Sequence, residues 1–187
     1  MKDFLKSFNI LSEQEIAELS SSAIEKRISK NDFLIKEGQI SNSVAFIKSG
    51  LFRSYYYSSA GEEVTYCITF PNVFITAYSS FILGQPTSEN IQAITNADLL
   101  IIPKEKIESL GESSINWMKF QKIIAELQYI ELENRIFLLQ KEKASLRYEV
   151  LLKSHPEFIK HIPLNYLASY LGITQRHLSR LRKELVY

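Results

Sequence analysis

The spacing of apolar residues divides the chain into a strand-rich region with helical segments on either side. Ser12, with Glu15 three residues later and then Ile16 and Leu19, is typical of a capping box that begins a short helix. Strand signals separated by glycines follow, at residues 32–38, 43–50, 51–63, 64–70, 90–94 and 98–103. Several short strands joined by turns predict an antiparallel sandwich or barrel.

One segment, "VTYCITF" at 64–70, shows the strand period most clearly. Val64, Tyr66, Ile68 and Phe70 alternate with polar residues, which predicts a strand with one apolar face. The sole cysteine, Cys67, lies in this segment and is interpreted as a strand residue rather than a redox thiol. A single cysteine also excludes an internal disulfide, a four-cysteine zinc site and a cysteine-ligated iron–sulfur cluster within this chain.

A long helix is predicted after Gly111, because apolar residues recur there at spacings of 3, 4, 3, 4 and 3. The positions of this dimer seam are Phe120, Ile123, Leu127, Ile130, Asn134 and Phe137. Asn134 falls at an a position, where a buried polar residue fixes register and favours two strands. The alternative is a long helix packed on its own domain, since further apolar residues widen the stripe. We interpret the segment as a dimer helix that also contacts the sheet domain.

The C-terminal run "LNYLASYLGITQRHLSRLRKEL" has the spacing of a helix-turn-helix. Ala168 is small where two helices would cross, Gly172 permits a left-handed turn, and Thr174 can cap the second helix. The apolar residues that would bury this motif are Leu167, Leu171, Ile173, Leu178 and Leu181. Their combined spacing favours DNA binding over the alternative, an amphipathic surface helix with ordinary charges.

The polar face of the second helix carries the side chains that suit DNA. Gln175, Arg176, Ser179 and Arg180 are the candidate base contacts, since Arg pairs with guanine and Gln with adenine. The candidate phosphate contacts are Thr174, Arg182 and Lys183, with an intramolecular pair as the alternative for Arg182.

The charge distribution agrees with a polyanion partner. Residues 141–187 contain nine Lys/Arg and four Asp/Glu, whereas residues 1–140 contain thirteen and seventeen. Apolar residues at 45 % and charged residues at 23 % indicate a folded protein. The early charges of "MKDFLKSFNILSEQE" do not fit a signal peptide, and no run of about 18 apolar residues exists, so we expect a cytoplasmic protein and no membrane partner.

The whole arrangement resembles the Crp-Fnr family of bacterial transcription regulators. The glycines of "KEG", "KSG" and "SAGEE", at 36–38, 48–50 and 59–63, fall where the turns of that family's β-roll fall. The resemblance implies an α+β fold with an antiparallel β-roll of the double-stranded β-helix or jelly-roll type. It implies a sensor roll at 1–111, a dimerisation helix at 112–143 and a helix-turn-helix domain at 144–187. Its implied partners are double-stranded DNA, a second copy of the chain and RNA polymerase; a small-molecule effector is a further candidate.

The chain departs from the family where cyclic AMP would bind. Family members that bind this nucleotide have Gly-Glu and a later Arg-Ser/Thr-Ala, and the Arg pairs with the phosphate. Thr76 and Ala77 replace the first pair, and Thr87, Ser88 and Glu89 replace the second set. Residues 54–103 contain no Lys or Arg, although a buried phosphate needs a fixed cation. We therefore expect no cyclic AMP binding by the usual contacts.

Alternatives remain for the effector and for the function. Thr76, Ala77, Tyr78, Thr87 and Ser88 are the candidate effector-pocket residues, and the aromatic residues of the roll either line a pocket or fill the core. No cofactor, metal site or catalytic residue is expected, because no histidine precedes His155 and no nucleophile motif is evident. A sensor module whose helix-turn-helix does not recognise DNA is the second hypothesis, and a cupin-like enzyme is disfavoured.

A final expectation concerns the end of the chain. Many family members continue into a β-wing after the recognition helix, whereas this chain stops at Tyr187. Fewer phosphate contacts should lower both the affinity for DNA and its dependence on salt.

Overall fold

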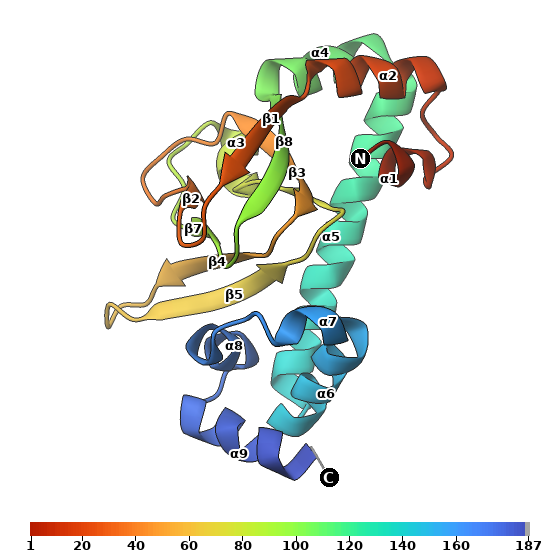
Figure 1. The fold of residues 1–187 in the computed structure, drawn as a ribbon. Coiled ribbons are helices and arrows are strands. Elements are labelled where there is room, and N and C mark those ends of the chain that lie inside the picture. Colours follow the sequence, from red (N-terminus) through yellow and green to blue (C-terminus); the bar gives the residue numbers. More distant parts are fainter. Residues whose placement is uncertain (186–187) are drawn as a thin grey trace.

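The computed structural model describes residues 1–185, so the end of the expected C-terminal domain and the expectation about a wing lie outside the described residues. Two four-stranded antiparallel sheets face each other as a β-roll (Figure 1). The sheet orders are β1-β8-β3-β6 and β2-β7-β4-β5. The strands are β1 (Ile24–Ile28), β2 (Phe33–Ile35), β3 (Ser43–Ser49), β4 (Phe52–Tyr57), β5 (Glu63–Thr69), β6 (Phe74–Ile75), β7 (Asn90–Ala93) and β8 (Ala97–Pro103).

All six predicted strand segments contribute to this roll, and the predicted antiparallel sandwich is confirmed. The prediction missed β1 and β6. The first four residues of β1, "IEKR", are exposed, because β1 forms an edge of its sheet and pairs only with β8. An exposed edge strand carries no apolar alternation, so its sequence gives little strand signal.

The helices surround the roll at its ends and along one side. They are α1 (Lys2–Lys6), α2 (Glu13–Ser22), α3 (Tyr78–Leu83), α4 (Lys104–Ser113), α5 (Ile115–Lys141), α6 (Ala144–Ser154), α7 (Pro156–Ile159), α8 (Leu164–Leu171) and α9 (Gln175–Leu185). The predicted capping box is confirmed at the start of α2, where Ser12 and Glu15 exchange both hydrogen bonds. Within residues 1–185, no helix has the length and apolar character needed to cross a membrane.

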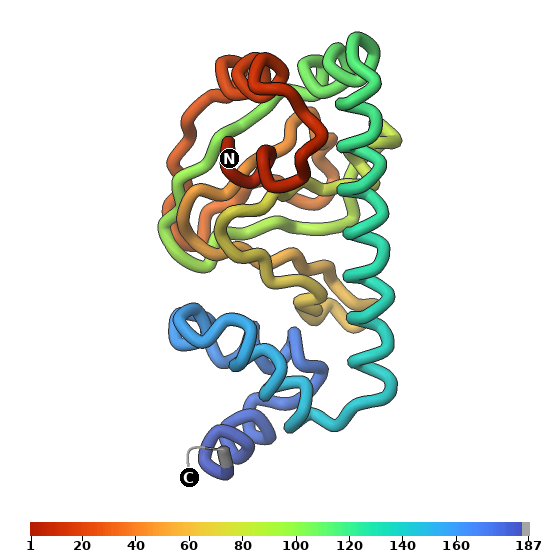
Figure 2. The backbone as a smooth tube through the Cα atoms, turned by 90° about the vertical axis from the view of Figure 1, so that its right-hand side faces the viewer, coloured from red at the N-terminus to blue at the C-terminus, as the bar shows by residue number. Residues whose placement is uncertain are grey.

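The long helix α5 connects the roll to the C-terminal helices. Its N-cap is Ser114, whose hydroxyl accepts a hydrogen bond from the backbone N–H of Trp117. The helix runs straight along one side of the roll and continues below it, where α6 to α9 are grouped (Figure 2). This arrangement places α9 at the end of the molecule farthest from α2 and α4 (Figure 1).

The start of α5 is buried within its own chain. Trp117 and Phe120 are 1 % and 4 % exposed, in a cluster with Leu5 of α1 and Leu110 of α4. The Phe120 ring also meets the ring of Phe8 edge-on. The prediction that Phe120 belongs to a dimer seam is therefore wrong, since its side chain already fills an intramolecular core.

Candidate nucleic-acid interface

The turn between α8 and α9 has the conformation that its sequence predicts. Gly172 adopts a left-handed conformation with φ of 67°, and its N–H donates to the carbonyl of Ser169. The hydroxyl of Thr174 accepts the backbone N–H of His177 at 3.2 Å, which makes Thr174 the predicted cap of α9. Buried side chains then fix the crossing of the two helices, namely Leu167, Ala168, Leu171, Leu178 and Leu181.

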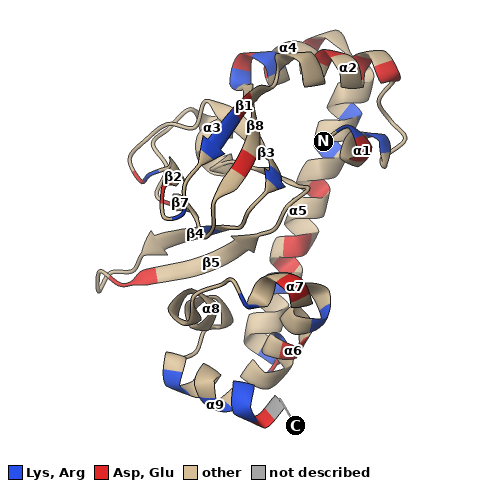
Figure 3. Cartoon of the chain, in the orientation of Figure 1, with Lys and Arg blue, Asp and Glu red and all other residues tan. Residues whose placement is uncertain are grey.

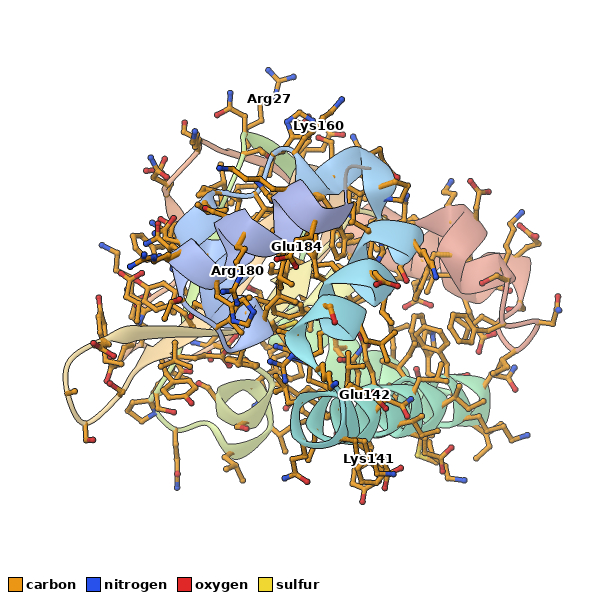
Figure 4. All side chains as sticks on the ribbon, turned by 90° about the horizontal axis from the view of Figure 1, so that it is seen from below. Arg27, Lys141, Glu142, Lys160, Arg180 and Glu184 are labelled. Carbon is orange, nitrogen blue, oxygen red and sulfur yellow. The ribbon has the colours of Figure 1, made fainter. Side chains whose placement is uncertain are left out.

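The opposite face of α9 is polar, cationic and open to solvent. Gln175, Arg176, Arg180 and Lys183 are exposed, and Ser179 is half-buried beside them. Lys and Arg positions mark α9 at the free end of the molecule, whereas acidic positions gather on the middle of α5 (Figure 3). Seen from below, Arg180 and Glu184 lie on α9 at the front of the molecule (Figure 4). Their contact is loose, with 3.7 Å between Nε and the carboxylate.

Arg182 differs from the other cations of this helix. Its side chain is half-buried, and its guanidinium lies 5.9 Å from the centre of the Tyr148 ring of α6. This placement favours an intramolecular contact for Arg182 over the alternative, a contact with phosphate.

Below the buried start of α5, its apolar side chains face outward. The exposed members of the expected dimer seam are Leu127, Ile130, Asn134 and Phe137, and Ile123 is half-buried. Leu132, Ile136 and Leu139 are exposed as well, on the other flank of the same helix. An exposed apolar stretch of this length on a helix is typical of a surface that pairs with another chain.

The five candidate effector-pocket residues differ in their surroundings. Thr76 and Ala77 line a hollow of about 500 Å³ together with residues 39–43. Thr87 is buried and exchanges backbone hydrogen bonds with Gly38 and Gln39, while Tyr78 and Ser88 are exposed. The Thr76 hydroxyl is already satisfied, since it donates to the Ser43 carbonyl at 2.9 Å.

The aromatic residues of the roll are not gathered in one environment. Tyr55 and Phe81 are buried, whereas Tyr56, Tyr57 and Tyr78 are exposed.

The sequence reasoning missed a half-buried polar pair on the roll. The hydroxyl of Tyr66 on β5 donates to the carboxylate of Glu89, which directly precedes β7. Burial raises the pKa of Glu89 above its ordinary value, although hydrogen bonds from Tyr66 and Ser54 act in the opposite direction. Burial likewise raises the pKa of Cys67 to about 11, so its thiol is protonated at neutral pH. Neither the pair nor the thiol offers positive charge to a phosphate.

Comparison with known proteins gives one family match. Residues 25–114 match the family described as "Cyclic nucleotide-binding domain". The "Anaerobic regulatory protein" of Haemophilus influenzae is 28 % identical over 186 residues, which cover 91 % of this chain and 70 % of that relative.

Two solved structures illustrate the shared fold. FixK2 from Bradyrhizobium japonicum matches with a TM-score of 0.77 at 17 % identity, over 87 % of this chain and 84 % of that one. The Thermus thermophilus catabolite activator protein matches with a TM-score of 0.59 at 17 % identity, over 94 % of this chain and 84 % of that one.

Proposed function

Because the chain belongs to the Crp-Fnr family of transcription regulators, we propose that it acts as a homodimer that binds a pseudo-palindromic DNA site. The observation that carries the proposal is the amphipathic division of α9, with Leu178 and Leu181 buried and Arg176 and Arg180 exposed. A helix of this kind can enter the major groove while its other face remains packed on its own domain.

The side chains of α9 suggest a division of roles. Gln175, Arg176, Ser179 and Arg180 are the proposed base contacts, because their polar groups lie on one face of α9 and can donate hydrogen bonds to guanine and adenine. Lys183 near the end of the helix and Thr174 at its cap are the proposed phosphate contacts. The ion pair with Glu184 would release Arg180 at little cost, since exposed pairs contribute only about 0–1 kcal/mol.

The exposed apolar side chains of α5 support the homodimer. Two α5 helices paired side by side would bury Leu127, Ile130 and Phe137, which are 47 %, 50 % and 45 % exposed in the single chain. The two copies of α9 would then enter successive major grooves about 34 Å apart on one side of the duplex.

The test is a selection of genomic DNA fragments with the purified chain at several salt concentrations. We expect a small set of fragments to outcompete bulk DNA at each concentration, and to share two inverted half-sites. If no fragment outcompetes bulk DNA, specific regulation is excluded. A tight effector bound to the roll, together with uniformly weak DNA binding, would instead favour the sensor-module hypothesis.

A further inference from the structure

The C-terminal cluster is packed against the roll as well as against α5. Leu51, Ile68 and Ile94 of the roll share one apolar cluster with Leu167 and Leu171 of α8. Helix α8 lies directly beneath the β4–β5 side of the roll (Figure 1). The position of α8 therefore depends on the sheet, and α9 follows α8 after a turn of three residues, 172–174.

Arg53 of β4 lies at the centre of this contact and is only 2 % exposed. The sheet supplies a partner to each nitrogen of its guanidinium, since Nη1 lies 2.7 Å from the Glu63 carboxylate and both Nε and Nη2 donate to Oε1 of Gln92. A buried arginine is tolerated only with such partners. All of these polar partners come from the same sheet, so Arg53 belongs structurally to the roll.

The flat faces of that guanidinium are covered by two tyrosines. Its central carbon lies 4.0 Å from the ring centre of Tyr55 in the same strand and 3.5 Å from that of Tyr166 in α8. Arginine stacks on aromatic rings in this way because its charge is delocalised over a plane, whereas a lysine ammonium is a point charge. The contact with Tyr166 therefore depends on the planar guanidinium, which lies within 3.5 Å of the ring centre.

Two more contacts on the same face of α8 prevent it from rotating about this stack. The hydroxyl of Ser169 accepts the backbone N–H of Thr65 at 2.9 Å and donates to the carbonyl of Glu63 at 3.3 Å. The ring of Tyr170 lies 3.7 Å from the guanidinium of Arg135 on α5. Tyr166, Ser169 and Tyr170 are three and four residues apart, so they share one helix face.

We propose that Arg53 is a positioning residue, which fixes α8 on the roll and thereby presents the polar face of α9 to DNA without any effector. The inference rests on the proposed function, because it assigns to Arg53 the orientation of the DNA-contacting helix. It also makes the β4–β5 hairpin, which supplies Arg53, Glu63 and Thr65, the part of the roll that is coupled to α9.

Two substitutions at Tyr166 test the stack without removing the buried charge. Tyr166→Phe keeps the ring, and Tyr166→Leu removes it; the matched control is Tyr129→Leu, at an exposed tyrosine of α5. Arg53→Lys keeps the positive charge but removes the planar guanidinium, and so tests whether the contact needs that plane. The DNA-free measurement is hydrogen exchange of the Thr65 amide, which Ser169 protects. We expect exchange roughly tenfold faster in Tyr166→Leu and Arg53→Lys, and wild-type exchange in Tyr166→Phe and Tyr129→Leu.

The second measurement is the ratio of specific to bulk DNA affinity. Tyr166→Leu should lower this ratio about tenfold and leave bulk affinity unchanged, because the cationic face of α9 is intact but misplaced. Unchanged Thr65 exchange in Tyr166→Leu and Arg53→Lys would overturn the inference, and so would faster exchange with an unchanged affinity ratio. If the wild-type chain itself shows no specific binding, the proposed function fails, and the exchange measurement alone still decides whether Arg53 holds α8.

Discussion

Arg180 is a cation of α9 whose side chain is available to a base. It is exposed, and its only recorded partner among residues 1–185 is Glu184, at 3.7 Å on the same helix. Arg182, two residues later, lies instead against Tyr148. This difference follows from the helical period, which turns neighbouring cations toward solvent or toward the core.

Replacing Arg180 with Ala should relax specificity at a single base pair of each half-site. We expect the loss to be about 1–3 kcal/mol for the preferred base there, with other positions unaffected. The measurement is a competition titration against a panel of single-base variants of the selected site. Arg27→Ala is the matched control, because it removes the same charge from a side chain of the roll that pairs with Asp98. An equal loss for Arg27→Ala, or a uniform loss across the panel for Arg180→Ala, would contradict a base contact.

At the same scale, the sequence could identify residues that act through local geometry but not those that act through tertiary contacts. Gly172, Thr174 and Ser12 were predictable because turns and caps require particular residue types at fixed offsets. Arg53 was not, since its partners Gln92 and Tyr166 lie 39 and 113 residues away in the sequence. No spacing rule connects such distant positions.

Helix α5 is the element on which the proposed dimer depends, and its sequence is apolar on more than one side. Leu127 lies on the expected seam, while Leu132 is comparably exposed on the other flank. The two positions are five residues apart and therefore project in directions about 140° apart. The helix consequently offers an internal comparison between its two flanks.

Leu127→Asp should dissociate the dimer, because the substitution places a charge in an apolar seam. We expect the dimer dissociation constant to rise at least about 100-fold, as measured by sedimentation equilibrium. Leu132→Asp should leave the association close to that of the wild type. The opposite ranking would place the interface on the other flank of α5.

The pattern of whole elements was predictable where a single periodicity dominated. Strand β5 shows where a prediction from periodicity fails. Thr65 and Ile68 are both buried, at 2 % and 6 % exposed, although the predicted alternation places them on opposite faces of the strand. A register shift between Ser54 and Tyr55 of β4 disturbs the alternation at this point. In addition, α8 covers the face that an isolated sheet would leave open to water. Phe120 was misassigned for a similar reason, since α1 packs where a partner helix was expected.

For the molecule as a whole, the contact between the roll and the C-terminal helices includes an ionisable side chain, His155, stacked on Phe70. The ring of His155 lies 3.6 Å from that of Phe70 in a nearly parallel stack. Burial lowers the pKa of His155 below its ordinary 6.5, although Glu157 and Glu131 act in the opposite direction. The folded chain therefore holds this imidazole in its neutral form more strongly than the unfolded chain does.

The stability of the molecule should therefore depend on pH through His155. As the pH falls, the unfolded chain takes up the proton before the folded chain does. The stability that depends on a neutral His155 is therefore complete above about pH 6.5, and it is lost as the pH falls toward the pKa of His155 in the folded chain. Chemical denaturation between pH 7 and pH 5 should show a steeper loss of the free energy of unfolding in the wild type than in His155→Phe, which keeps the stack. Equal slopes for both proteins would contradict this assignment.

The segment of the roll that matches the cyclic-phosphodiester contacts of the family contains no cationic residue. Residues 54–103 lack Lys and Arg, and Arg53 directs its guanidinium to Gln92, Glu63 and Tyr166. A thermal-shift titration with cyclic AMP and cyclic GMP should therefore show no stabilisation. A ligand at 100 times its dissociation constant would add about 2.7 kcal/mol to the free energy of unfolding. A clear shift with either nucleotide would show that another group supplies the missing charge.

The most direct test of the account is the dependence of DNA affinity on the spacing of the two half-sites. The selected site and a version with about half a helical turn, roughly 5 base pairs, inserted at its centre are titrated with the chain at one salt concentration. We expect two protomers to bind the original site, and affinity for the altered site to fall to that of bulk DNA. Undiminished affinity for the altered site would contradict a dimer that reads DNA with two copies of α9 held at a fixed distance.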